Sequence, residues 1–188
     1  RLAVTLASER GEVVGGVKRL ASLAKGALPG ASEPLALVPL AMAHECIPDD
    51  DDLPGYWVEV AKADGFFPDP EAFEESLESF KVAKVCEWAL EAMTRAKDLS
   101  DGRIDFDDMI YLPVALGWTR AWFDLVVIDE AQDMNAAQLI LATKACKRGG
   151  RICVVGDRRQ AIYGFRGADA GAEQDPKVKK VRDEITRA

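Results

Sequence analysis

Two neighbouring carboxylates follow an apolar run in this sequence, and a third carboxylate follows a second run. Residues 123–129 read FDLVVID and lead directly into Glu130, whereas residues 151–157 read RICVVGD. Four apolar residues before Asp-Glu form a Walker B pattern, in which the strand fixes the first carboxylate where it can bind Mg²⁺, usually through water. The next glutamate can take a proton from the water that attacks a γ-phosphate. From these residues alone, the alternative is that Asp129 and Glu130 only begin a loop and cap the next helix.

The elements that must position these acids follow from the apolar pattern. The continuous apolar centre of both runs is typical of a strand buried on both faces. Between them, Asn135 can cap a helix over residues 136–147, which Gly149-Gly150 would end. Strand, helix and strand within about 35 residues predict a right-handed βαβ unit with parallel strands. Ligands of such sheets bind beyond the carboxyl ends of the strands, so we expect both acidic segments at one edge.

The chain before this unit has a helical pattern. Apolar residues recur at helical spacing over residues 14–24 and predict a helix that Gly26 and Pro29-Gly30 end. The turn-rich stretch 48–70 includes a short predicted helix around Trp57. We expect the longest helix to start at Asp69 as N-cap with Pro70 in its first turn and to reach about Lys97. Its apolar stripe, interpreted as helix packing, comprises Phe73, Leu77, Phe80, Ala83, Trp88 and Met93.

Three strings of the second half resemble motifs of one family. Residues 129–133 read DEAQD and residues 156–168 read GDRRQAIYGFRGA. They resemble, in order, motif II (D-E-x-Q-D) and motif III (G-D-x-x-Q-x-I-Y-x-[FW]-R-G-A) of superfamily-one DNA helicases of the UvrD/Rep type. Residues 105–109, DFDDM, resemble the segment that precedes motif II there, and Asp105 is expected to cap a helix. The resemblance covers residues 104–169. The Ser-Ala-Thr motif of DEAD-box proteins is absent, and RecD/Pif-type helicases lack the I-Y-x-F-R-G-A ending.

The resemblance implies a role for each matching residue. Asp129 would hold Mg²⁺, Glu130 would be the general base, and Gln160 would sense the γ-phosphate and link it to the DNA site. Three residues would lie towards single-stranded DNA: Tyr163, Phe165 and Arg166. An amide can bond to a phosphate oxygen without a pKa to manage, and an aromatic ring can stack on any base. For the two aromatic residues the alternative is packing in the core.

The resemblance also implies a fold and an activity. The fold is α/β: part of a P-loop (RecA-like) parallel-sheet domain over residues 104–188, preceded by a mostly helical accessory subdomain over residues 1–103. The activity is that of an ATP-dependent 3′ to 5′ DNA helicase or translocase. Its cofactors would be ATP and Mg²⁺, and its partners single-stranded DNA or a single/double-strand junction and the remaining helicase domains of a parent chain. The expected location is the cytoplasm with its nucleoid, or another intracellular compartment that contains DNA.

One part of an ATP site is missing from the sequence. A phosphate-binding loop reads G-x-x-x-x-G-K-[ST], and the nearest string, residues 11–19, reads GEVVGGVKR, with Val17 before Lys18 and Arg19 in place of a hydroxyl. The family's later motifs are absent too, and the first residue, Arg1, is not Met. We therefore expect a helicase fragment that is inactive alone. The alternatives are a non-catalytic helicase-like binding module and an unrelated nucleotide-binding domain.

Composition sets wider limits on function. The 188 residues carry a net charge of −8, but residues 1–30 and 144–188 are net basic and residues 31–143 strongly acidic, a distribution compatible with a local phosphate-contacting face. No run of 18 apolar residues occurs, so no membrane partner is expected. The four cysteines form no C-x-x-C pair, which predicts buried free thiols in a reducing compartment.

Overall fold

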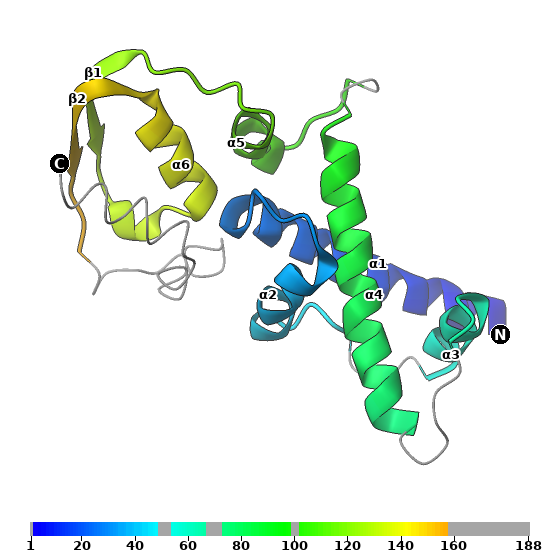
Figure 1. The fold of residues 1–188 in the computed structure, drawn as a ribbon. Coiled ribbons are helices and arrows are strands. Elements are labelled where there is room, and N and C mark those ends of the chain that lie inside the picture. Colours follow the sequence, from blue (N-terminus) through cyan, green and yellow to red (C-terminus); the bar gives the residue numbers. More distant parts are fainter. Residues whose placement is uncertain (1, 49–53, 67–72, 99–101, 158–188) are drawn as a thin grey trace. The chain divides into compact units, whose positions relative to one another are not determined.

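The chain forms two compact units, seen in a computed structural model that describes residues 2–48, 54–66, 73–98 and 102–157 (Figure 1). Unit 1 comprises Arg1–Ala21 and Ala31–Thr94, and unit 2 comprises Ser22–Gly30 and Arg95–Ala188. The predicted α/β class is confirmed, because helices predominate and two strands form a small parallel sheet. The predicted boundary at residue 103 concerns functional subdomains and stays a prediction.

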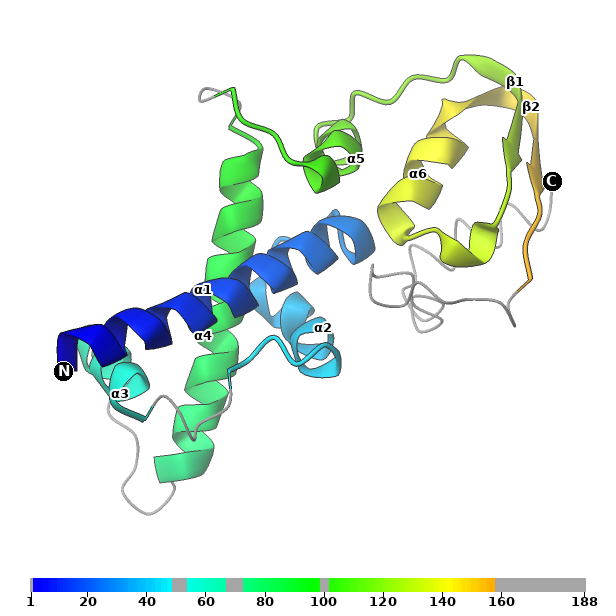
Figure 2. The same cartoon turned by 180° about the vertical axis from the view of Figure 1, so that it is seen from behind.

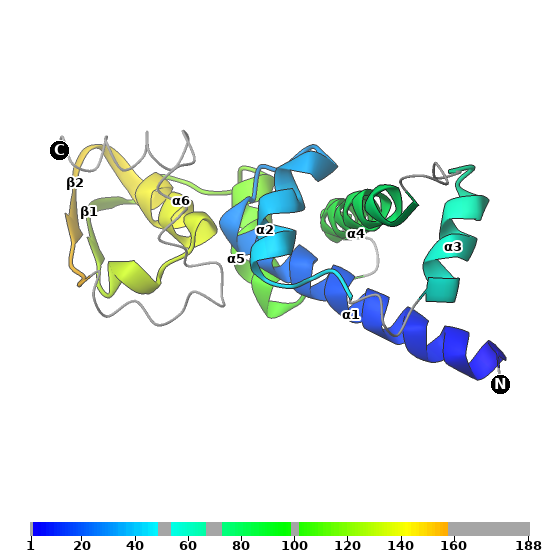
Figure 3. The ribbon, with the colours of Figure 1, turned by 90° about the horizontal axis from the view of Figure 1, so that it is seen from below.

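Unit 1 is helical. Its elements are most of α1 (Leu2–Ala27), the 3₁₀ turn η1 (Pro34–Leu37), α2 (Val38–Ala43), α3 (Pro54–Ala63) and α4 (Phe73–Ala96) up to Thr94. In Figures 1 and 2 α4 crosses α1, and Figure 3 shows α4 between α2 and α3. The three predicted helices are confirmed as α1, α3 and α4, whereas η1 and α2 were not predicted. The expected end of the first helix at Gly26 is wrong, because α1 includes this glycine, and α1 also begins well before residue 14. The predicted N-cap Asp69 and Pro70 lie outside the described residues.

The core of unit 1 is built from fully buried side chains and paired aromatic rings. Trp57 has no exposed surface, and its ring stacks on that of Trp88 with 6.1 Å between centroids. Phe66 stacks on Phe80 at 4.8 Å. The buried residues of α4 form the stripe Leu77, Lys81, Val85, Cys86, Ala89 and Met93. The predicted stripe was therefore shifted, and Ala83 in particular is exposed.

One glycine allows a close backbone approach in unit 1. A Cβ atom on Gly16 would lie 2.2 Å from the backbone oxygen of Cys46. Real Cβ atoms do not come so close, so α1 can pass the end of α2 only with glycine at this position. Gly16 belongs to the string nearest to a phosphate-binding loop, and in the structure it has a packing role inside α1.

Unit 2 contains the predicted βαβ arrangement. β1 (Phe123–Ile128) pairs in parallel with β2 (Cys146–Val154), and α6 (Ala136–Ala145) runs between them and packs on the sheet (Figure 1). Asn135 caps α6 as predicted, through a capping box with Gln138. The helix α5 (Phe106–Ala115) contacts α6, and its N-cap is Asp105, also as predicted.

Two expectations about the sheet are wrong. Gly149-Gly150 does not end the helix, because α6 stops at Ala145 and both glycines lie in β2. Between the paired positions Phe123–Cys146 and Leu125–Arg151 the register shifts, and the positive φ of Gly149 (82°) accommodates the extra residues. The strands are also not buried on both faces: three apolar side chains of β1 are more than half exposed, namely Phe123, Leu125 and Val127.

Two further expectations can be compared with the described residues. All four cysteines are free, but only Cys46 and Cys86 are buried, whereas Cys146 is half-buried and Cys153 is exposed. Burial raises the pKa of the Cys86 thiol to about 11, with a smaller contribution from Cys46. Among the described helices, none combines the length and the apolar character that a membrane crossing requires.

Candidate functional site

The acidic segments that follow β1 and β2 meet at one edge of the sheet. The backbone N–H of Val155 donates to the oxygen of Ile128 (2.8 Å), and the N–H of Ala131 donates to the oxygen of Val155 (3.0 Å). The hydrogen-bond ladder therefore continues past the ends of both strands. This continuation brings residues 129–130 beside Asp157 and confirms the predicted convergence of the two segments.

The backbone turns sharply at Glu130. This residue has φ 51° and ψ 43°, the left-handed region, which for a residue other than glycine costs about 1–2 kcal/mol. The 3₁₀ turn η5 (Ala131–Asp133) follows at once, and the N–H of Asp133 donates to the backbone oxygen of Glu130 (2.9 Å). The turn leaves the side chains of Asp129 and Glu130 exposed at the end of the strand, where a ligand in solution can reach them.

Gln132 joins the two acidic segments. Its Nε2 donates to Oε2 of Glu130 (2.6 Å), and its Oε1 accepts a hydrogen bond from the backbone N–H of Asp157 (3.0 Å). One amide therefore contacts a carboxylate from the first segment and the backbone of the second. This role of Gln132 was not predicted from the sequence, where the residue only matches a motif; its one signal there is its position two residues after Glu130.

The donor set at this edge suits Mg²⁺ shared with a phosphate. Oδ1 of Asp129 accepts from the N–H of Glu130 (2.9 Å), and Oδ2 has no partner in the part of the chain that the structure describes. Among those residues no group of three or more His, Cys, Asp or Glu could hold a metal ion. Mg²⁺ commonly uses one or two carboxylates, retained waters and substrate phosphates rather than a cage of protein ligands. The exposed carboxylates of Asp129 and Glu130 fit that pattern.

Four predicted site residues cannot be placed at this edge. Gln160, Tyr163, Phe165 and Arg166 lie outside the described residues, which end at Asp157 in this region. Their roles, and the short helical turn expected between Gln160 and Phe165, stay predictions. The described part of motif III is therefore its first two residues, Gly156 and Asp157.

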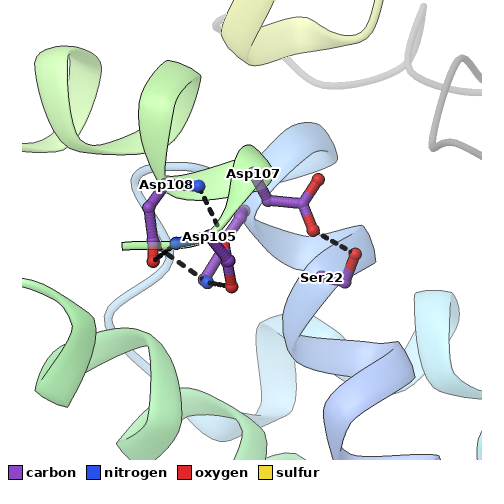
Figure 4. Close-up of polar contacts among 5 residues, drawn as sticks. Ser22, Asp105, Asp107 and Asp108 are labelled. Atoms are coloured by element: carbon purple, nitrogen blue, oxygen red, sulfur yellow. Dashed lines mark hydrogen bonds and ion pairs between the residues drawn. The ribbon is translucent and has the colours of Figure 1, made fainter. Parts of the chain in front are cut away.

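A second polar cluster lies in unit 2, at the start of α5 (Figure 4). Lys25, in the last turn of α1, places its Nζ 2.8 Å from Oδ2 of Asp105 and 2.8 Å from Oδ1 of Asp108. The two aspartates also form the capping box of α5, with Asp108 N–H donating to Asp105 Oδ1 (2.7 Å). Ser22 donates a further hydrogen bond to Asp107. The DFDD string thus fastens the end of α1 to α5.

The electrostatics of this cluster favour the charged forms. Burial disfavours the charge of Lys25, but its hydrogen bonds and charge interactions with Asp105 and Asp108 outweigh this effect and raise its pKa. Burial likewise opposes ionisation of Asp105, yet Lys25 and the N–H of Asp108 hold its pKa below the usual value. No local pattern in the sequence points to Lys25, because its partner Asp105 lies 80 positions further along the chain.

Comparisons with known proteins agree with these motifs. The family described as "UvrD/REP helicase N-terminal domain" matches residues 56–175. The chain is 38% identical over 81 residues to "ATP-dependent DNA helicase PcrA" of Bacillus subtilis, and 39% identical over 74 residues to the PcrA helicases of Staphylococcus epidermidis and Staphylococcus aureus. These alignments cover 39% and 35% of this chain but only 11% and 10% of the relatives. No solved structure matches the chain.

Proposed function

Because the chain belongs to the UvrD/REP helicase family, we propose that it supplies part of the motor of an ATP-dependent DNA helicase. In this proposal unit 2 provides the acid pair for Mg-ATP hydrolysis and the segment that couples ATP to single-stranded DNA. The chain spans about a tenth of the length of the curated relatives it matches, so the remaining helicase domains would complete the motor. Translocation would run 3′ to 5′, and the DNA would be a single strand or its junction with a duplex.

The observation that carries this proposal is the exposed acid pair at the carboxyl edge of the sheet. Asp129 would hold Mg²⁺, which when bound neutralises charge on the β- and γ-phosphates. Glu130 would accept the proton of the attacking water. A base must lie within hydrogen-bond reach of that proton, and the bent backbone at Glu130, with its bond to Gln132, gives its carboxylate a defined direction.

The DNA side of the proposal rests on motif III. Gln160 would contact the γ-phosphate, and Tyr163, Phe165 and Arg166 would lie against the single strand. Stacking on an aromatic ring grips any base by its face, which suits a motor that must ignore sequence. Support for this half comes from the string GDRRQAIYGFRGA and the family match rather than from side-chain geometry.

The decisive experiment uses the product of the whole reading frame that contains these residues. Glu130→Gln keeps the size of the side chain but cannot accept the proton, so DNA-stimulated ATP turnover should fall by about 10²–10⁴-fold while ATP binding persists. Asp129→Ala should instead weaken Mg²⁺-dependent nucleotide binding. Asp124→Asn is the matched control, because Asp124 lies on the same strand, is exposed and bonds only to Lys147 among the described residues. Near-normal turnover of Glu130→Gln would remove Glu130 as the base.

The 188-residue chain alone provides a second test. It should show no DNA-stimulated ATP hydrolysis, because the loop whose backbone N–H groups and lysine hold the β- and γ-phosphates is not in the sequence. Phosphate release would be measured with and without single-stranded DNA. Turnover that Glu130→Gln abolishes would show that residues 11–19 bind phosphate after all. Strand displacement by the longer product, on duplexes with a 3′ or a 5′ tail, tests the polarity.

A further inference from the structure

Gln132 forms a hydrogen bond with each of the two acidic segments. It lies in the turn η5, in which the N–H of Asp133 donates to the backbone oxygen of Glu130, and its side chain is half-buried. The bond from its Nε2 to the Glu130 carboxylate is 2.6 Å long. A hydrogen bond with an ionised partner is shorter and stronger than a neutral one. The amide can therefore hold this carboxylate without bringing a charge or a titration of its own.

The other end of the same amide meets the second segment at a position where a side chain would displace the amide. Oε1 of Gln132 accepts from the N–H of Asp157, and a Cβ atom on the preceding Gly156 would lie 2.5 Å from that oxygen. The Cβ would also lie 3.0 Å from the backbone nitrogen of Ala131. The φ of Gly156 is not in the left-handed region, so the backbone itself would accept alanine. Space for the Gln132 amide is what this glycine provides.

We propose that Gln132 is a positioning residue for the hydrolytic step. One amide atom orients the Glu130 carboxylate, and the other fixes the backbone at the start of motif III, so the base and the segment that leads to Gln160 are held in register. This inference rests on the proposed function, because it assigns Gln132 a part in the reaction that Glu130 performs. A consequence is that displacing the amide should reduce turnover and its stimulation by DNA together.

The test uses the product of the whole reading frame and steady-state ATP hydrolysis with and without single-stranded DNA. Gln132→Ala should lower kcat by about 10–100-fold, the usual cost of losing a partner that orients an active-site ligand, and leave KM for ATP within about 2-fold. Gly156→Ala should lower kcat in the same direction, because the added methyl group pushes the amide away from Asp157. The double variant Gln132→Ala/Gly156→Ala should be little worse than Gln132→Ala alone, because the shortened side chain removes the closest contact of the methyl group and leaves only its approach to the backbone, 3.0 Å from the nitrogen of Ala131.

A conservative variant and a control separate positioning from folding. Gln132→Glu keeps an oxygen that can accept from Asp157 but replaces the donor to Glu130 with a negative charge, so it should not restore turnover. Gln138→Ala removes another glutamine of the same region, the capping-box partner of Asn135, and should lower the melting temperature without lowering kcat. If Gln132→Ala changes the melting temperature as Gln138→Ala does and leaves kcat and DNA stimulation unchanged, Gln132 has a structural role only.

The outcomes also separate this inference from the proposed function. If Glu130→Gln abolishes turnover but Gln132→Ala and Gly156→Ala do not reduce it, Glu130 is the base and the positioning role is wrong. If Glu130→Gln keeps normal turnover, the proposed base itself is wrong. In the double variant Glu130→Gln/Gln132→Ala, the proposal expects the rate of Glu130→Gln alone, because Gln132 acts through Glu130. A further large loss would show that Gln132 acts through something else.

Discussion

Unit 1 buries most of its large apolar side chains, although Leu35 and Met42 are exposed, whereas unit 2 leaves many of its own in solvent. In unit 1 the rings of Trp57 and Trp88 stack inside a helical core. In unit 2 Trp118, Trp122 and Phe123 are each more than half exposed. The strings that resemble helicase motifs lie in the unit with the more exposed side chains. The DFDDM string and motifs II and III all belong to unit 2.

This difference shows what each half of the sequence encodes. In unit 1 most apolar residues of the helical pattern are buried between helices of the same unit, and none of the predicted site residues lies there. Among the described residues, unit 2 has a sheet of two strands with α6 packed on one face and apolar side chains exposed on the other. We infer that unit 2 is part of a larger sheet, whose other strands would come from the remainder of a helicase domain. Substitutions in the two units should therefore have different consequences.

Removal of a buried ring from unit 1 should have the largest effect on stability. Trp57→Ala should cost about 3–5 kcal/mol, the usual price of deleting a core aromatic side chain. Trp57→Phe should cost much less, because it keeps a ring and removes the indole N–H, which is buried without a hydrogen-bond partner among the described residues. Denaturant unfolding of this chain, followed by circular dichroism, measures both.

The control for Trp57 is an exposed tryptophan of unit 2. Trp122 is 66% exposed, so Trp122→Ala should change the unfolding free energy of this chain by no more than about 0.5 kcal/mol. Equal losses from Trp57→Ala and Trp122→Ala would contradict the contrast between the units, since they would mean that Trp122 packs as tightly as Trp57.

The ion cluster of Lys25 is the polar exception to the loose packing of unit 2. Lys25→Met should cost about 3 kcal/mol at neutral pH, the lower end of the range for removing one partner of a buried ion pair, because Asp105 is 59% exposed and can regain water. Lys147→Met is the control: its ion pair with Asp124 is exposed on both sides and should contribute about 0–1 kcal/mol. The same denaturant series measures both variants.

The Lys25 cluster also predicts a pH dependence of stability. The lowered pKa of Asp105 adds stability above the pKa of an unfolded aspartate, about 3.9, and this contribution is lost as pH falls through the folded value. The raised pKa of Lys25 adds stability below about 10.4, and this contribution is lost as pH rises through the folded value. The gap between wild type and Lys25→Met should therefore be widest between these limits and close on both sides. A gap that stays the same from below the lower limit to above the upper limit would show that the ion pairs do not stabilise the fold.

Helix starts could be predicted from the sequence because a cap depends only on residues within the first turn. Asp105 and Asn135 were predicted as caps, and both form capping boxes, since a cap depends on residues three positions away. The convergence of the acidic segments followed from the parallel topology. The expected burial of Leu125 and Val127 was wrong for a different reason: an apolar run predicts a strand but not what packs on it, and among the described residues nothing buries these two side chains.

The contacts that sequence reasoning missed are those that join distant residues. Lys25 meets Asp105 across 80 positions, and no local pattern specifies that pairing. Gln132 reaches Asp157 across 25 positions, and the need for glycine at position 156 appears only once the amide occupies the space. The bulge at Gly149 likewise depends on pairing with β1, so a glycine pair that normally ends a helix was assigned to the wrong element.

Substitution of Phe165 tests whether unit 2, to which motif III belongs, also contacts DNA. In the product of the whole reading frame, Phe165→Ala should lose about 1–3 kcal/mol of affinity for single-stranded DNA, the worth of one stacked base. It should also reduce DNA stimulation of the ATPase while basal turnover stays nearly unchanged, and Phe165→Trp should be tolerated. A DNA titration is run beside a thermal melt. A large fall in melting temperature with unaltered affinity would assign Phe165 to packing.

Leu125→Ala should have the smallest effect on the unfolding free energy of this chain and a much larger effect in the longer product. Its side chain is 56% exposed on the open face of the sheet, so Leu125→Ala should cost no more than about 0.5 kcal/mol in the 188-residue chain. If a larger sheet and its helices cover that face, the same substitution should cost about 2–5 kcal/mol in the product of the whole reading frame. Lys62→Ala, an exposed side chain of unit 1 paired only with Glu59 among the described residues, should cost little in both. Denaturant unfolding of the two variants in both proteins compares the two contexts. If Leu125→Ala lowers the unfolding free energy by the same small amount in both proteins, the apolar face stays in solvent. The inference that unit 2 is part of a larger sheet would then be wrong.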